Sequence, residues 1–257
     1  MSELLKAIII AIVQGITEWL PISSSAHLTL MEKILNYPSA LTFHVALHLG
    51  TLMALFVYFG RDITDIIQDI LRLKFHTENG KLGIFILIAT IPAALIGFIF
   101  KKSFESIFSN LTILAIGLGI TGLVLIMASL PLNYKNKKIT KTKALLIGTS
   151  QILSLIPGIS RSGTTISTAL FLGLKEKTAV KFSYLISIPI ILGANIATIG
   201  NQTLPKELIW ATLTSFLTGL IFIHFSFTYI LSKRKNLGYI GIYVILLALI
   251  IGIFLFY

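Results

Sequence analysis

The sequence predicts an all-α polytopic integral membrane protein, on three observations. First, 55% of its 257 residues are hydrophobic and only 12% are charged, whereas about a quarter of the residues in a soluble domain are charged. Second, six apolar segments are long enough to cross the hydrocarbon core, which takes roughly 20 residues of helix: 39–60, 82–100, 111–131, 178–200, 208–231 and 237–257. Third, basic residues gather in short loops between these segments.

The loop charges predict how the chain is oriented. The loops 61–81, 132–143 and 232–236 are rich in Lys and Arg and are therefore expected to be cytoplasmic. The segments 101–110 and 201–207, which carry few lysines, are expected outside together with the C-terminus. The net charge of +11 then reflects orientation, and no nucleic-acid partner is expected. The absence of cysteine excludes disulfides, thiolate metal sites and cysteine catalysis.

Two polar segments, QGITEWLPISSSAH at 14–27 and QILSLIPGISRSGTT at 151–165, interrupt the apolar chain. A constant offset of 137 positions pairs Gln14 with Gln151 and Ser23 with Ser160. Together with the loop charges, this similarity predicts two re-entrant helical hairpins, 1–38 from outside and 144–177 from the cytoplasm. The single membrane domain 1–257 then consists of two repeats of inverted topology, 1–131 and 144–257. The alternative is that each segment is a membrane span kinked at its proline.

The second segment has the composition of an anion site. Its turn is rich in hydroxyl groups and precedes an apolar run, so that backbone N–H groups, hydroxyls and a helix N-terminus can converge on a phosphate. Arg161 can bind phosphate oxygens through two parallel hydrogen bonds. For each serine alone, capping of the helix is the alternative.

The first segment holds the acidic group. Gln14 and Glu18 are four residues apart and share a helix face, which suits a bound cation or proton handling by the carboxylate. An ion pair between Glu18 and Arg161 is the alternative. Ser23, Ser24 and Ser25 precede His27, and a serine near a base is the layout of an activated nucleophile.

Two further features come from the apolar spans. His44 and His48 lie four residues apart, but two histidines without a nearby carboxylate are an incomplete metal site, so helix packing with satisfied hydrogen bonds is expected. The glycines Gly117, Gly119 and Gly122 indicate close helix contact or dimer packing.

Over essentially its whole length the chain resembles the undecaprenyl-pyrophosphate (undecaprenyl-diphosphate) phosphatase family of the bacitracin-resistance type. Its first signature is met by Gln14, Glu18 and Pro21 to His27, and its second, Pro-Gly-x-Ser-Arg-Ser-Gly-x-Thr, by Pro157 to Thr165. Two positions depart from the common pattern. Gln14 stands where many members have Glu, which weakens a two-carboxylate metal site, and Ala26 stands where Gly is usual.

The resemblance implies an activity and its setting. The activity is hydrolysis of undecaprenyl diphosphate to undecaprenyl phosphate and inorganic phosphate at the outer face of the bacterial plasma membrane. This recycles the lipid carrier for peptidoglycan synthesis, which links the family to cell-wall biogenesis, cell shape and bacitracin resistance. The resemblance also implies a divalent cation, Mg²⁺ or Ca²⁺, and a homodimer. The rival hypothesis is a transporter or flippase of a polyprenyl phosphate or another anion, which an inverted repeat would fit equally well.

The resemblance also implies residue roles. Ser24 is expected to be the nucleophile or to position it, and Glu18 and His27 to handle protons or bind the cation, with Gln14 beside Glu18. Arg161 is expected to act in catalysis and in phosphate binding. The remaining phosphate-binding candidates are hydroxyl residues of the two segments: Ser23, Ser25, Ser160, Ser162 and Thr165.

Overall fold

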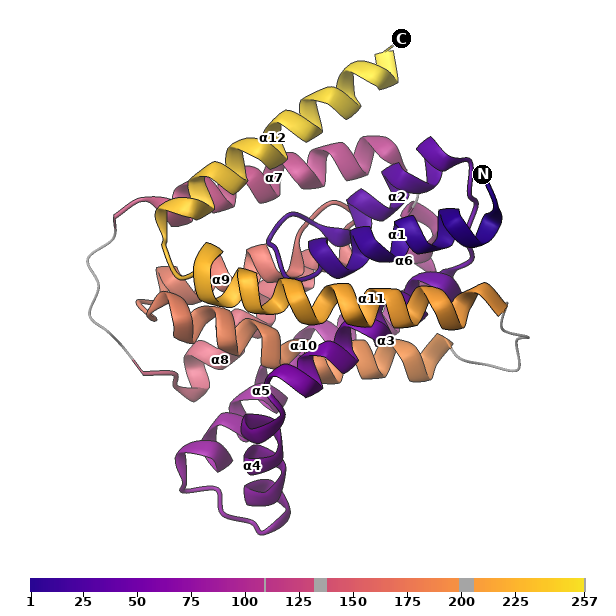
Figure 1. Ribbon diagram of the computed structural model, residues 1–257. Helices are drawn as coiled ribbons and strands as arrows, with labels where there is room; N and C mark the ends of the chain where they lie inside the picture. The colour runs from indigo at the N-terminus through magenta and orange to yellow at the C-terminus, as the bar shows by residue number, and fades with distance from the viewer. Residues whose placement is uncertain (109, 132–137, 199–205, 257) are drawn as a thin grey trace.

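A computed structural model describes residues 1–108, 110–131, 138–198 and 206–256 (Figure 1). Over these residues the chain forms helices and no strand. Six helices are long and apolar enough to cross a membrane, which confirms the six predicted spans to within a few residues: α3 (Leu41–Tyr58), α5 (Glu78–Ile99), α7 (Leu111–Ser129), α10 (Glu176–Thr198), α11 (Lys206–Phe225) and α12 (Lys235–Phe256). Parts of the predicted loops, 132–137 and 199–205, lie outside the described residues.

Each polar segment contains a non-helical break that separates two short helices. In the first pair, α1 (Glu3–Thr17) ends just before Glu18, and α2 (Ser24–Leu35) returns beside it (Figure 1). In the second, α8 (Lys141–Ser150) continues into the 3₁₀ helix η1 (Gln151–Leu155) and is followed by α9 (Arg161–Phe171), which packs against α8. Each pair is thus two half-helices joined by a non-helical break. Re-entry from opposite membrane faces, and with it the inverted repeat, stays a prediction.

The long helices pack around these two broken pairs. α7 lies beside α12, and α11 lies beside both α1 and α3 (Figure 1). The two chain ends lie toward one end of the bundle, and the turn between α11 and α12 toward the other. A Cβ on Gly122 of α7 would come within 2.7 Å of the Gly241 carbonyl on α12. The predicted close helix contact therefore exists at Gly122, whereas a Cβ on Gly119 would meet no atom of the described residues within 4 Å.

Two short helices complete the described chain, α4 (Gly60–Leu71) and α6 (Lys101–Ile107). α4 packs against α5 through its buried Ile63 and Ile66 and projects from the body of the molecule (Figure 1). It is closed by Leu73, whose φ of 55° is left-handed, and by a hydrogen bond from Lys74 N to the Asp69 carbonyl. This is the hydrogen-bond pattern of a Schellman C-cap, with leucine where glycine is usual.

Candidate functional site

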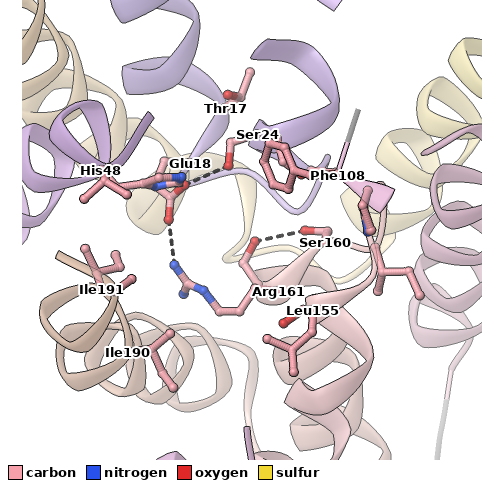
Figure 2. A pocket seen from close by; sticks show the side chains of 18 of the residues that line it. Thr17, Glu18, Ser24, His48, Phe108, Leu155, Ser160, Arg161, Ile190 and Ile191 are labelled. Atoms are coloured by element: carbon pink, nitrogen blue, oxygen red, sulfur yellow. Dashed lines mark hydrogen bonds and ion pairs between the residues drawn. The ribbon is translucent and has the colours of Figure 1, made fainter. Parts of the chain in front are cut away.

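The breaks in the two helix pairs meet at one pocket of about 240 Å³ (Figure 2). Most of its polar wall comes from both breaks and from α3, and includes Thr17, Glu18, Ser23, Ser24, Ser25, His48, Ser160, Arg161 and Ser162. Its apolar wall comes mainly from η1, the second break and α10, and includes Leu155, Pro157, Ile159, Ile190, Ile191 and Ala194. Segments more than a hundred residues apart in the sequence therefore share one cavity.

An ion pair joins the two breaks. Glu18 Oε1 accepts a hydrogen bond of 2.7 Å from Arg161 Nη2, and both side chains are largely buried (Figure 2). Arg161 Nη1 also donates to the Ser183 carbonyl on α10, at 3.2 Å. The alternative of a Glu18–Arg161 ion pair is thus what the structure contains. These contacts engage two of the five N–H bonds of a guanidinium, so the pair is compatible with a phosphate bound to the same arginine.

Ser24 points its hydroxyl at the second oxygen of the same carboxylate. Ser24 Oγ donates to Glu18 Oε2 at 2.8 Å (Figure 2). A serine whose proton faces a carboxylate has the arrangement of a nucleophile with its general base. The base that the structure brings to Ser24 is Glu18.

The backbone at Ser23 shapes the same corner. Ser23 has a φ of 66°, a left-handed conformation that is uncommon for serine. As the residue before α2 it makes no side-chain cap, and its Oγ lies 3.1 Å from Ser25 Oγ instead. The first N–H groups of α2 therefore lack the partner that a cap provides, and a helix N-terminus in this condition favours an anion.

The serines of the second break act differently. Ser160 caps α9, because its Oγ accepts from Gly163 N at 3.1 Å, so for this residue the capping alternative holds. Ser162 Oγ donates to the Leu20 carbonyl of the first break, at 3.2 Å. Both line the pocket, but each already has a structural partner.

Two predicted site residues lie behind the pocket lining. His27 contacts the Ser23 carbonyl through Nδ1 and the Tyr243 hydroxyl on α12 through Nε2, each at 2.8 Å. Thr165 is fully buried, and its hydroxyl bonds the Arg161 carbonyl and Ser183 Oγ. These positions support the turns that carry Ser24 and Arg161. Direct contact of His27 or Thr165 with a phosphate stays a prediction.

His48 belongs to the site, contrary to the expectation that it only packs between helices. Its Nδ1 lies 2.8 Å from Gln14 Nε2 and 3.3 Å from Glu18 Oε2, and the side chain lines the pocket. For His44 the packing expectation is correct in part, since it is buried and pairs with Glu32 at 2.8 Å. The sequence places no carboxylate next to these histidines, but the fold brings Glu18 to His48 and Glu32 to His44. The available signal was a polar side chain in an otherwise apolar span.

The site offers oxygen donors to a cation but no complete cage. Among the described residues, no three His, Cys, Asp or Glu side chains gather. Glu18 and Gln14 are nevertheless adjacent, with Gln14 Nε2 3.2 Å from Glu18 Oε2, and Gln14 Oε1 is buried without a partner in the described part of the chain. A carboxylate and an unpaired amide oxygen fit a hard cation such as Mg²⁺, which often takes one or two protein carboxylates and completes its shell with substrate phosphates and water.

Asn195 is a further lining residue that the sequence did not single out. Its Nδ2 donates to the Ile191 carbonyl at 2.9 Å, while its buried Oδ1 has no partner among the residues that the structure describes. An asparagine inside an apolar span was the only sequence signal.

Comparison with known proteins shows the family to which the chain belongs. Residues 7–250 match the family model described as bacitracin resistance protein BacA. The chain is 46% identical to the undecaprenyl-diphosphatase of Geobacter sulfurreducens over 206 residues, 77% of either chain. It is 37% identical to that of Moorella thermoacetica over 97% of each, and 39% identical to that of Korarchaeum cryptofilum over 91% of this chain and 94% of the relative. The resemblance predicted from the two signatures is confirmed.

Proposed function

Because the chain belongs to the bacitracin resistance protein family, we propose that it hydrolyses undecaprenyl diphosphate to undecaprenyl phosphate and inorganic phosphate. The single observation that carries this assignment to particular atoms is the shared carboxylate. Glu18 accepts from Ser24 through one oxygen and from Arg161 through the other. A nucleophile, its base and a guanidinium that can bind phosphate therefore lie close together beside the N-terminus of α2.

The geometry supports a covalent route. Ser24 Oγ attacks the terminal phosphorus while its proton passes to Glu18, and the bond from that phosphorus to the bridging oxygen breaks. Undecaprenyl phosphate leaves with the bridging oxygen. Water then attacks the phosphorus of the phosphoserine, and the bond from that phosphorus to Ser24 Oγ breaks. Inorganic phosphate leaves with the oxygen of the water, and Ser24 Oγ takes back the proton that Glu18 held. The N–H groups at the start of α2 and the guanidinium of Arg161 stabilise the charge on the equatorial oxygens, which is the main contribution of a protein to phosphoryl transfer.

We include a divalent cation in the proposal, held by Glu18 and the unpaired Oε1 of Gln14. When bound, such a cation neutralises charge on the phosphate oxygens. Two things support this cation. One is the donor set, in which Glu18 is the one carboxylate among the described lining residues, and the other is the family resemblance.

The size and lining of the pocket suit a lipid whose diphosphate alone enters the protein. A cavity of about 240 Å³ is smaller than the usual ligand pocket of about 300 to 1,000 Å³, so it accommodates the diphosphate while the polyprenyl chain stays in the bilayer. Phe108, from the segment predicted to lie outside, lines the pocket. This supports a site that opens to the outer face of the plasma membrane. A homodimer is proposed on the family resemblance alone.

Phosphate release by purified protein tests the proposal. In detergent, where no transport can be measured, the protein is expected to release phosphate from undecaprenyl diphosphate. Ser24→Ala is expected to lose this activity, while Ser106→Ala, an exposed serine on α6, retains it. Brief incubation and acid quench should trap phosphate on Ser24.

The transporter hypothesis predicts the opposite outcome. Folded protein would then release no phosphate in detergent yet move polyprenyl phosphate across reconstituted vesicles. The relatives compared above carry the name of a diphosphatase, and they give the transporter hypothesis no support.

A further inference from the structure

Glu18 follows the end of α1, in a turn that has no regular structure to hold it. The next carbonyl along, that of Trp19, lies beyond the helix end, where carbonyls lack helical partners. Trp19 is fully buried, so this carbonyl cannot turn to water, and a buried polar group needs a partner within the protein.

Two hydroxyls from distant helices reach this carbonyl. Tyr184 Oη of α10 and Ser226 Oγ at the end of α11 each lie 2.6 Å from Trp19 O, and 2.8 Å from one another. Both hydroxyls donate to this carbonyl, which can accept two hydrogen bonds through its two lone pairs. The Tyr184 ring also packs edge-on against the Trp19 ring, with centroids 5.1 Å apart.

The backbone around Ser226 is adapted to this contact. Ser226 begins a π-helical segment, Ser226–Ile230, and π-helical turns inside α-helices occur frequently at functional sites. Ser226 is fully buried and comes from the last turns of a membrane span. The π-helical segment thus begins at the residue whose hydroxyl donates to the Trp19 carbonyl.

Ser183, the residue before Tyr184, contacts Arg161, the partner of Glu18 in the ion pair. The Ser183 carbonyl accepts from Arg161 Nη1 at 3.2 Å, and Ser183 Oγ lies 2.7 Å from Thr165 Oγ1, which in turn bonds the Arg161 carbonyl. Neighbouring residues of α10 therefore hold the first break through Trp19 and the second break through Arg161.

We propose that Ser183 and Tyr184, with Ser226, are positioning residues that set Glu18 against Arg161 and Ser24. This inference rests on the proposed phosphatase activity. It assigns no contact with the substrate to these three residues. They act through the carbonyl of Trp19 and the guanidinium of Arg161, and they make the distance between the two breaks depend on a single point of α10.

Three variants test the role in catalysis: Tyr184→Phe, which keeps the ring against Trp19, Ser226→Ala, and the two combined. Because either hydroxyl can serve the carbonyl alone, each single variant should lower kcat only about threefold. The double variant leaves the carbonyl without a donor and should lower kcat about 100-fold, since a displacement of about 1 Å costs this much. KM should change far less than kcat, because substrate binding is not what is lost.

The matched control is Ser215→Ala. Ser215 lies on α11, in the same membrane span as Ser226, is equally buried, and donates across to the Leu47 carbonyl of α3 at 2.8 Å. It should retain near-normal kcat. The inference is overturned if the double variant loses no more than the product of the single losses, or if Ser215→Ala loses as much as the double variant.

A second measurement does not depend on activity. Amide hydrogen exchange over residues 17–22 should speed up in the double variant but not in Ser215→Ala, because only the former releases the turn. Unchanged exchange in the double variant would overturn the positioning role. If the unmodified protein releases no phosphate, the proposed function fails, and the exchange experiment still decides whether Tyr184 and Ser226 hold this turn.

Discussion

At the scale of single residues, the site is organised around one carboxylate. Glu18 receives Arg161 on one oxygen, and Ser24 and Gln14 on the other, with His48 beside them. Burying two opposite charges costs desolvation, which close contact and additional hydrogen bonds offset. A substitution at any of these positions therefore changes the environment of all the others.

Arg161→Lys should reduce turnover about 100-fold or more while the protein remains folded. Lysine keeps the positive charge but cannot donate to Glu18, to the Ser183 carbonyl and to a phosphate in the fixed geometry of a guanidinium. Phosphate release and thermal unfolding measure the two effects. Arg61→Lys, at an exposed arginine on α4, is the control, and near-normal turnover of Arg161→Lys would remove the phosphate-binding role.

Gln14→Glu should make the enzyme depend more strongly on a divalent cation. Gln14 Nε2 lies 3.2 Å from Glu18 Oε2, so the substitution places two carboxylates in contact. These repel each other without a cation and bind one more tightly with it. Titrating Mg²⁺ in the phosphate-release assay should give half-maximal activity at a lower concentration than in the unmodified protein. Gln68→Glu, exposed on α4, should behave like the unmodified protein, and an unchanged Mg²⁺ titration for Gln14→Glu would contradict the cation site.

The residues of the two signatures could be predicted from the sequence because polar side chains in an apolar chain are costly unless they function. His48, Asn195 and Tyr184 could not be predicted in this way. Each sits in a membrane span whose neighbours are apolar, and their contacts depend on which face of the span is turned inward. That rotation is set by packing against helices far away in the sequence.

At the scale of elements, α7 hydrogen-bonds the backbone of the second break through Thr121. Thr121 Oγ1 accepts from Ser160 N at 2.9 Å and donates to the Gly158 carbonyl at 3.1 Å. Gly158 itself has a φ of 88°, which favours glycine. The break in the second helix pair was predicted from Pro157 and Gly158, but its dependence on α7 was not, because nothing in the sequence pairs these segments.

Gly117→Ala and Gly119→Ala, two positions apart on α7, form a matched pair. A Cβ on Gly117 would lie 2.3 Å from the Pro157 carbonyl, whereas a Cβ on Gly119 would have no neighbour within 4 Å in the part of the chain that the structure describes. The first substitution should therefore destabilise the protein by about 1 to 3 kcal/mol and displace the turn that carries Arg161, which lowers activity. The second should be neutral or slightly stabilising, because alanine favours helix. Equal thermal stability of the two variants would contradict the contact.

At the scale of the whole molecule, apolar length predicted the six spans because the thickness of the hydrocarbon core imposes it. Less regular features escaped prediction. The 3₁₀ turn η1 and the π-helical turn after α11 come from local competition between helical hydrogen bonds and tertiary contacts, which periodicity does not record. The direction of insertion is still a prediction from loop charge.

Single cysteines can test that direction, since the chain has none of its own. Lys102→Cys, exposed on α6, should react in intact cells with a thiol reagent that does not cross membranes. Lys233→Cys, exposed in the turn before α12, should react only after the membrane is opened. The reverse labelling pattern would mean that the pocket opens to the cytoplasm.

The distance along the chain between the two charged partners has a consequence for biogenesis. Glu18 is synthesised 143 residues before Arg161. At about 5 to 20 residues per second, the ribosome takes on the order of 10 s to cover that interval. During this time Glu18 has no Arg161 to pair with, and a carboxylate without a counter-ion is costly to bury in hydrocarbon. We therefore expect the first helix pair to reach its final position only after α9 has been synthesised, late in translation.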